Sequence, residues 1–562
     1  MIERATAHRL DGDWRAACAA ADVDVAFTLG GIARDHGTAT AGAVAEDLRH
    51  LVPDLLRWHL PRAGHGRTTI ATHRVVLLAD YYEPGAMDVT DVYCGCECHL
   101  LYVETPTLLD GPQRLRLGFG RPRRAAANRP LRTDYWLRPR YLWDSRRSHE
   151  LLTYSGGGER APFLHRDGTL LGERELPRRA PGPDDPVAHA EWVTGLMDAG
   201  HVEAALDSAG IDVDASVDAS PSLAALARVP LAPTRVLGGL PERWPVYGLR
   251  REETEWELVA PGPRTPGLVL RRGDRRRPYG AGLVLHAAGG GRRAPALPHG
   301  CLRLPDLDLL RAGMITPEEL HPLVRSALFP ERPPASGPVG PPEPAPPAAV
   351  RVRCRGEWHE VRPDREGLLT PHGRGERDRE RALAALSGPV AGCFAAERAW
   401  NLGAGRIPRG LREQREELFL RVQHGDTPGV LRLLDEGADA HVRDGRKRTL
   451  LHHLHKVDHR ELLPRLLMAG LDLEARDHHE RTPLHMAVGE HGSEELVRAL
   501  LAAGARIDVL DHRDLGLRNL IRRRNMVRRS GRPELMFLAE RVTREFPDLQ
   551  ESIRFDNYGR MY

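Results

Sequence analysis

Three cysteines and one histidine form the sequence pattern with the clearest capacity for chemistry: Cys94, Cys96, Cys98 and His99, in the stretch CGCECH. On a strand, alternation would place the three thiols on one face and His99 on the other. Three thiolates can bind Zn²⁺ or Cu⁺, but zinc sites usually combine two Cys-x₂₋₄-Cys pairs, and there is no second pair here. Because cysteine is also a common small buried hydrophobe, we favour burial and keep these four residues as candidate metal ligands.

A second group that resembles a metal cluster is His452, His453 and His455 with His459. His455 and His459 would lie one helical turn apart. No cysteine or carboxylate completes a ligand set, so we do not predict a site here. We expect His452 to have a structural role and the other three to face solvent.

Two stretches are rich in arginine. Residues 121–149 hold nine Arg against two Asp, interleaved with aromatic residues, and residues 513–532 hold eight Arg against one Asp. Arginines with aromatics can bind phosphates and stack bases. The whole chain, however, carries 81 basic and 78 acidic residues, a net charge of only +3. We therefore favour a solvated rim with core aromatics, and nucleic-acid binding remains an alternative.

Motifs for catalysis are missing from the sequence. His165-Arg166-Asp167 resembles a kinase catalytic loop, but Gly172 stands where that loop needs asparagine. The glycine clusters near residues 280 and 290 lack the phosphate-loop Lys-Ser/Thr, and there is no Gly-x-Ser-x-Gly elbow. No cofactor is predicted, and whether the N-terminal region is an enzyme stays open.

Length and composition indicate a multidomain globular protein. The 562 residues are too many for one core, and 41% apolar with 28% charged residues suit folded domains. No basic leader followed by an apolar core, and no run of eighteen apolar residues, is present, so we expect no membrane span and a cytoplasmic location. Lys447 and Lys456 are the only lysines, a bias that suggests a bacterial, GC-rich genome.

The chain order predicts a mixed α+β N-terminal region in two parts, residues 1–180 and 181–329. Residues 1–62 read as helical, and apolar runs at 72–79, 91–104 and 115–119 predict a strand meander. Leu151–Tyr154 and Thr169–Leu171, separated by glycines, predict a further hairpin. In the second part, Asp185 should cap a helix, and Gly200 and Gly210 should end two.

The later part of the chain begins with residues 330–349, a Pro-rich spacer that cannot form a core. Residues 350–412 predict a hairpin and a helical connector. Residues 413–562 predict an all-α helical repeat domain with a closing helix at Pro533–Phe546.

Apolar pairs define the repeats within this last domain. Val430-Leu431 and Leu433-Leu434 are matched by Leu462-Leu463 and Leu466-Leu467, and again by Leu496-Val497 and Leu500-Leu501. This spacing gives each helix one apolar stripe, which only stacked neighbours can bury. Gly437, Gly470 and Gly504 stand where each helix should end in a left-handed residue.

The stretch RTPLHMA at 481–487, with TLLH thirty-three residues upstream, resembles the ankyrin repeat. The resemblance covers roughly residues 413–515 and implies a solenoid with a concave protein-binding face. It also implies that Thr449 with His452, and Thr482 with His485, are tied into hydrogen bonds between turns. Partner-binding residues expected at the turns are Arg446, Lys447, Arg448, His478, His479, Glu480, Arg481, His512 and Arg513.

Three features depart from the ankyrin pattern. Leu450 replaces a proline, Lys447 and Glu480 stand where a turn glycine is usual, and Pro464 falls inside a helix. An interior proline costs about 3 kcal/mol or more, so we expect a less regular second repeat.

The sequence thus predicts a protein–protein interaction scaffold. The expected partner is an unidentified protein, with no membrane and no nucleic acid involved, and the chain is expected to be a monomer. The alternatives are an N-terminal metalloprotein or enzyme centred on Cys94, Cys96 and Cys98, or a nucleic-acid-associated protein using the Arg-rich stretches.

Overall fold

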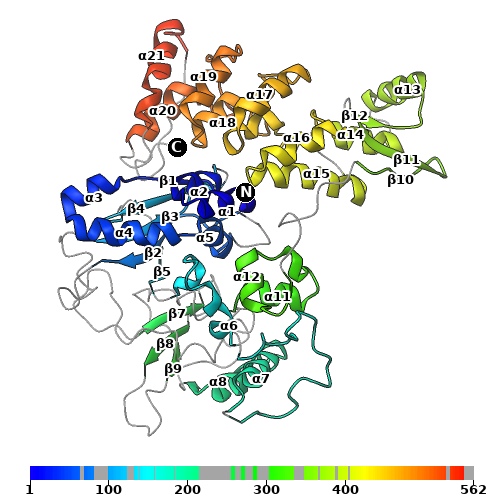
Figure 1. Cartoon of the computed structure of the whole chain (residues 1–562). Coiled ribbons are helices and arrows are strands. Elements are labelled where there is room, and N and C mark those ends of the chain that lie inside the picture. Colours follow the sequence, from blue (N-terminus) through cyan, green and yellow to red (C-terminus); the bar gives the residue numbers. More distant parts are fainter. Residues whose placement is uncertain are drawn as a thin grey trace. The chain divides into compact units, whose positions relative to one another are not determined.

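Figure 1 shows the computed structural model of the chain. The structure describes residues 1–63, 69–81, 99–109, 111–122, 132–137, 139–156, 158–182, 184–213, 255–259, 268–272, 283–287, 303–333, 347–364, 367–386, 390–402, 406–526 and 532–549. The chain divides into two compact units, one of residues 1–61, 73–105 and 114–341, the other of residues 62–72, 106–113 and 342–562. Every helix in these described ranges is too short or too polar to cross a lipid bilayer.

The first unit contains a five-stranded sheet (Figure 1). Its strands, in spatial order, are β1 (Val23–Val25), β4 (Leu115–Phe119), β3 (Leu100–Glu104), β2 (Arg74–Asp80) and β5 (Arg132–Tyr135). β2, β3 and β4 are antiparallel neighbours, which confirms the predicted meander, whereas β1 and β5 pair in parallel at the edges.

Short helices surround β1 and precede β2, as the apolar spacing predicts, although the strand β1 within residues 1–62 is not predicted by that spacing. They are α1 (Ile2–Leu10), α2 (Trp14–Ala20), α3 (Leu29–His36), α4 (Thr38–His50) and α5 (Pro53–His59). α4 and α5 are separate helices, because Leu51 and Val52 leave the helical conformation before Pro53.

The predicted hairpin at Leu151–Tyr154 is wrong, because this segment is the short helix α6. The Ser155 hydroxyl donates to the Leu151 carbonyl at 2.6 Å, and Gly156 follows with a φ of +80°. A left-handed glycine directly after the last helical turn is a common helix end, so the glycine here closes a helix instead of forming a hairpin turn.

Further along this unit, α7 (Pro186–Asp198) and α8 (Val202–Ser208) form an antiparallel pair. Asp185 caps α7 by accepting from the Ala188 amide at 2.9 Å, as predicted. A four-stranded sheet has the order β6 (Ile211–Val213), β9 (Leu283–Ala287), β8 (Leu268–Arg272) and β7 (Glu255–Val259). The last described helices of this unit are α11 (Pro305–Arg311) and α12 (Pro322–Leu328).

The second unit opens with what we call the hairpin–helix module, residues 350–402. It comprises the antiparallel strands β10 (Val350–Cys354), β11 (Glu357–Asp364) and β12 (Gly367–Leu369), then α13 (Arg374–Ala385) and α14 (Gly392–Leu402). The predicted hairpin is confirmed, with a tight turn in which Arg355 and Gly356 have φ of +52° and +93°.

The repeat array follows as successive helix pairs, coloured yellow to red in Figure 1. The pairs are α15 (Arg409–Gln423) with α16 (Thr427–Asp435), the 3₁₀ helix η6 (Leu450–Lys456) with α17 (His459–Met468), α18 (Pro483–Gly489) with α19 (Glu494–Ala502), and α20 (Leu517–Met526) with α21 (Met536–Glu545). Each pair packs on the next through its apolar stripe, so one hydrophobic core runs from Val352 to Val542. Leu535, Leu538, Ala539 and Val542 are fully buried, as predicted for a closing helix.

Candidate functional site

The tips of the turns that follow each second helix are built on one aspartate. We call residues 444–448, 477–481 and 511–515 the finger tips. Asp477 is typical, because its Oδ1 accepts from the amides of His479 at 2.8 Å and Arg481 at 3.0 Å. Asp444 and Asp511 do the same in their own tips. A carboxylate that satisfies two backbone amides fixes the tip geometry without using the outward side chains.

Neighbouring finger tips are joined by main-chain hydrogen bonds. The His478 amide donates to the Arg446 carbonyl at 2.9 Å, and the His512 amide donates to the His479 carbonyl at 3.0 Å. The Nδ1 atoms of His478 and His512 lie 3.2 Å and 3.0 Å from the same two oxygens. The tips therefore form one connected strip.

The expected partner-binding residues occupy different environments on this strip. Arg446, Lys447, His478, Glu480, His512 and Arg513 are exposed, His479 and Arg481 are half-buried, and Arg448 is buried. Arg448 Nε donates to Asp444 at 2.7 Å, and Arg481 Nη2 donates to Asp477 at 2.8 Å. Each of these two arginines stabilises its own tip by bonding the central aspartate, while the six exposed residues present their side chains to solvent.

Three imidazoles stack along the strip. The ring centroids of His478 and His479 are 3.7 Å apart, and those of His479 and His512 are 4.5 Å apart. Partial burial, and then the cationic forms of His478 and the neighbouring Arg481, lower the pKa of His479. The stack is therefore favoured while the rings are neutral.

The Thr449–His452 pair behaves as the resemblance implies, whereas the hydrogen bonds between Thr482 and His485 lie within their own turn. His452 Nδ1 lies 2.9 Å from the Thr449 hydroxyl, and its Nε2 donates to the Arg481 carbonyl at 3.0 Å, linking one repeat to the next. His485 Nδ1 lies 2.9 Å from the Thr482 hydroxyl. Burial lowers the pKa of both His452 and His485 to about 4. Both rings are thus neutral near pH 7.

The expectation that His453 and His455 face solvent is wrong, because both are buried, at 4% and 7% exposure. His453 Nε2 lies 3.3 Å from Asp444 Oδ2. Burial outweighs this carboxylate and lowers the pKa of His453 to about 3. The first helix of this repeat is a tight 3₁₀ helix, and it turns these side chains inward between the first and second repeats.

The first candidate metal ligands can be placed only in part. Cys94, Cys96 and Cys98 lie outside the described residues. His99 precedes β3, and its ring meets that of His36 edge-on, with centroids 4.7 Å apart. Within the part of the chain that the structure describes, no ligand set forms around His99.

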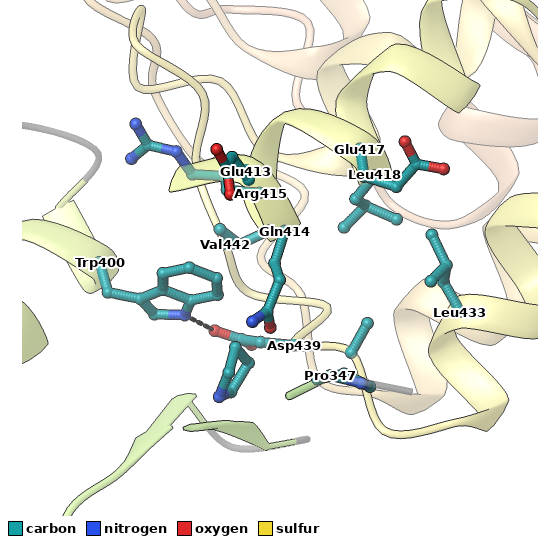
Figure 2. A pocket seen from close by; sticks show the side chains of 12 residues that line it. Pro347, Trp400, Glu413, Gln414, Arg415, Glu417, Leu418, Leu433, Asp439 and Val442 are labelled. Carbon is teal, nitrogen blue, oxygen red and sulfur yellow. Dashed lines mark hydrogen bonds between the residues drawn. The ribbon is translucent and has the colours of Figure 1, made fainter. Parts of the chain in front are cut away.

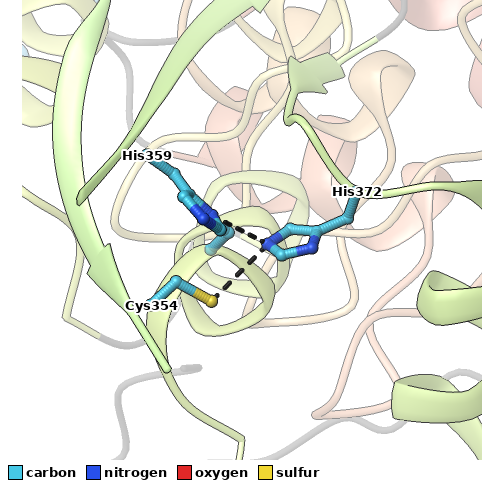
Figure 3. A group of neighbouring side chains, drawn as sticks. Cys354, His359 and His372 are labelled. Carbon is cyan, nitrogen blue, oxygen red and sulfur yellow. Dashed lines mark hydrogen bonds between the residues drawn. The ribbon is translucent and has the colours of Figure 1, made fainter. Parts of the chain in front are cut away.

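A different set of cysteines and histidines does converge, in the hairpin–helix module (Figure 3). The side chains of Cys354, His359, His372 and Cys393 place one ligand atom each within 4.8 Å of every other. His359 Nδ1 and His372 Nε2 are 3.2 Å apart, Cys354 Sγ lies 3.5 Å from His372 Nε2, and Cys393 Sγ lies 3.5 Å from His359 Nδ1. Two thiols and two imidazoles, the zinc-finger donor set, therefore face one point.

This cluster escaped sequence reasoning because its spacing is irregular. The four residues are separated by four, twelve and twenty residues, and no Cys-x₂₋₄-Cys pair marks them. One usable signal is the hairpin itself: Cys354 is paired with Glu357, so His359, two residues further on, shares its face of the sheet.

Beside the module lies a pocket of about 300 Å³ (Figure 2). Its apolar wall includes Trp400, Leu418 and Leu433, and Glu413, Arg415 and Glu417 also line it. Trp400 from α14 reaches Asp439 in the first repeat across this pocket, so the pocket marks the junction of module and array.

The Arg-rich stretches are used internally where they are described. Trp136 and Trp143 are fully buried, so they cannot stack on bases. Although burial opposes ionisation, hydrogen bonds from Arg146 and then Arg140 lower the pKa of Asp144. In the second stretch, Arg532 is buried and donates to the Gly492 carbonyl at 2.6 Å. These contacts favour the structural interpretation over nucleic-acid binding.

Comparison with known proteins matches the array alone. Residues 418–511 match the family model of ankyrin repeats, in three copies. No curated protein matches the chain. The chain is therefore an ankyrin repeat-containing protein, and the match does not extend to its N-terminal part.

Proposed function

We propose that this protein binds a protein partner through the finger tips of its ankyrin array and the first helices beside them. Ankyrin repeats generally mediate protein–protein interaction, and the observation that supports this use here is the connected strip of tips. Its fixed backbone means that binding would cost little loop entropy. The N-terminal region would act as the effector or as a second binding module.

The charges of the strip suggest the character of the partner surface. Arg446, Lys447 and Arg513 are exposed cations, while Glu480 and Asp514 are exposed anions. A partner surface with more acidic than basic residues would complement this pattern, and the interaction would then weaken as salt increases. The same proposal has the protein acting in the cytoplasm as a monomer. Light scattering on the purified chain would test the monomeric state.

Affinity capture from a lysate with charge-reversed full-length variants tests the proposal. Lys447→Glu combined with Arg513→Glu alters two finger tips. The matched control is Arg460→Glu combined with Arg544→Glu, which makes the same charge change on exposed helical positions away from the tips. We expect the wild type and the control to recover the same partner and the tip variant to lose it. Loss in the control alone, or equal recovery by all three proteins, would overturn the proposal.

A further inference from the structure

We propose that Cys354, His359, His372 and Cys393 bind one Zn²⁺, and that this ion fastens the hairpin–helix module over the N-terminal end of the repeat array. The site is distinct from the Cys94–His99 stretch and does not depend on the partner-binding proposal.

The separations of the donor atoms fit a zinc tetrahedron. Zinc–nitrogen bonds of about 2.05 Å and zinc–sulfur bonds of about 2.3 Å at tetrahedral angles require N···N separations of about 3.3 Å and S···N separations of about 3.6 Å. The corresponding separations here are 3.2 Å between the two imidazole nitrogens and 3.5 Å for the Cys354–His372 and Cys393–His359 pairs. The remaining donor separations are all within 4.8 Å, so the four atoms surround one point at close to the spacing that zinc requires.

A carboxylate behind one imidazole orients its inner nitrogen as a ligand. His372 Nδ1 lies 3.3 Å from Glu376 Oε2, and a proton held on Nδ1 leaves the lone pair of His372 Nε2 directed toward the other donors. Metal-bound histidines commonly donate their other N–H to a carboxylate in this way. The exposed Glu357 lies 3.8 Å from His359 Nε2, too far for a hydrogen bond, and adds a negative charge on that side of the site.

The backbone around the site is shaped to bring the four ligands together. Gly392, which directly precedes Cys393, has a φ of +61°. A Cβ at this position would lie 2.6 Å from the Cys354 sulfur and 2.8 Å from its Cα. Only glycine allows the start of α14 to approach β10 so closely, and this approach is what places the two thiols in one cluster.

The donor set and its burial favour structural zinc. Cys354, His372 and Cys393 are buried, and His359 is half-buried. Four protein ligands leave no open position for a substrate, as in structural zinc sites. Two thiolates with two imidazoles in a tetrahedral arrangement suit Zn²⁺ better than Mg²⁺ or Ca²⁺, which prefer oxygen ligands.

The position of the module explains what the ion would stabilise. The terminal repeats of an array need a cap, because their outer face has no neighbour to bury it. Here α14 carries Trp400 against the first repeat, where its indole donates to Asp439. The module is a three-stranded sheet with two helices at the end of the continuous core, and a metal is a common means of stabilising so small a unit. Zinc would tie β10, β11, the loop before α13 and the start of α14 together beneath this contact.

Metal analysis of the full-length chain, purified without a metal-affinity column, tests the proposal. We expect one zinc per wild-type chain from this site and its loss in Cys354→Ser and in Cys393→Ser. The matched control is the triple substitution Cys94→Ser, Cys96→Ser, Cys98→Ser, which should leave the zinc of this site in place. A zinc-free wild type, or zinc that is lost only in the triple variant, would overturn the proposal.

Cobalt substitution of the wild type keeps the test decisive if a serine variant fails to fold. Co²⁺ at this site should give the visible spectrum of a tetrahedral ion with two thiolates. His372→Cys should still bind, with the stronger charge-transfer absorption of three thiolates. A wild-type spectrum of octahedral cobalt, or one that His372→Cys does not alter, would assign the metal elsewhere.

Discussion

The indole Nε1 of Trp400 donates a buried hydrogen bond of 2.7 Å to Asp439 Oδ2, which joins the last helix of the hairpin–helix module to the first repeat of the array. Burial is the largest influence on Asp439 and raises its pKa, although the amide of His441 and this indole both oppose the rise. Without its donor, the carboxylate would remain buried with one fewer partner.

Trp400→Phe should therefore destabilise the first repeat of the array, where Asp439 lies. Loss of a hydrogen bond to a charged group costs about 1.5–3 kcal/mol, and we expect a loss of this size in the free energy of unfolding by urea. Trp358→Phe is the matched control, because Trp358 is 59% exposed on β11. Equal stability of the two variants would contradict the role given to this bond.

The carboxylate behind His372 should tune the metal affinity. Glu376→Gln keeps an acceptor near Nδ1 but removes its charge, and changes of this kind typically weaken metal binding about 10–100-fold. Competition with a chromophoric zinc chelator measures the effect. Glu380→Gln is the control, because Glu380 pairs with Arg355 and not with a zinc ligand. This variant should keep a zinc affinity within about 2-fold of the wild type in the same chelator competition. Similar affinities for both variants would remove Glu376 from the site.

All three finger tips contain a left-handed residue that is not glycine: Lys447 and Glu480 have a φ of +60°, and Asp514 has a φ of +57°. At Lys447 and Glu480 the family favours glycine. Glycine adopts this conformation without the Cβ clash but loses more entropy on folding. We expect Glu480→Gly to raise the free energy of unfolding by about 0.5–1 kcal/mol, on balance of those two effects. Arg446→Gly, at an exposed neighbouring position outside the left-handed region, should not stabilise the chain.

The interior proline of α17 offers a second route to stability. Pro464 is exposed and cannot donate a backbone hydrogen bond within the helix. Pro464→Ala should restore that bond and raise the free energy of unfolding by about 1–3 kcal/mol. Pro428, also exposed but in the first turn of α16, is a tolerated position, so Pro428→Ala should be nearly neutral. Equal gains for both would exclude the helical explanation.

Acid should weaken the array through its buried histidines. The pKa values of His452 and His485 are about 4 in the fold, against 6.5 for an ordinary histidine. The unfolded chain therefore binds more protons below pH 6.5, so stability present above that pH declines as the pH falls toward 4. Each histidine contributes about 1.4 kcal/mol per pH unit to this decline.

Urea unfolding between pH 7 and 4.5 measures this slope. His452→Gln removes one titrating group and should make the slope shallower by about 1.4 kcal/mol per pH unit. His512→Ala, at an exposed position, should leave it unchanged. A slope that is the same in His452→Gln and wild type would show that His452 is not the titrating group.

The repeats could be predicted from the sequence because their determinants are local. Gly437, Gly470 and Gly504 end their helices with φ of +99°, +81° and +100°, as their positions indicate. Val430, Leu462 and Val497 are fully buried by the same helical spacing. Each of these features depends on a few adjacent residues and on a register that recurs.

Other features depend on contacts that spacing does not encode. Cys354 and Cys393 meet only because a sheet and a helix pack together around Gly392. Leu151–Tyr154 is a helix that ends before the left-handed Gly156. A glycine at this position is equally compatible with a hairpin turn, so the sequence alone does not distinguish the two structures. His453 is buried because the array covers a residue whose polar type favours solvent.

The main-chain bonds between finger tips restrict how this surface can diversify. Because the His478 and His512 amides bind carbonyls of the preceding tip, a residue inserted into one turn would put it out of alignment with both neighbours. Point substitutions at Lys447 or Arg513 leave that alignment intact. Specificity for a new target would therefore be acquired by substituting exposed side chains on turns of constant length, without insertions or deletions.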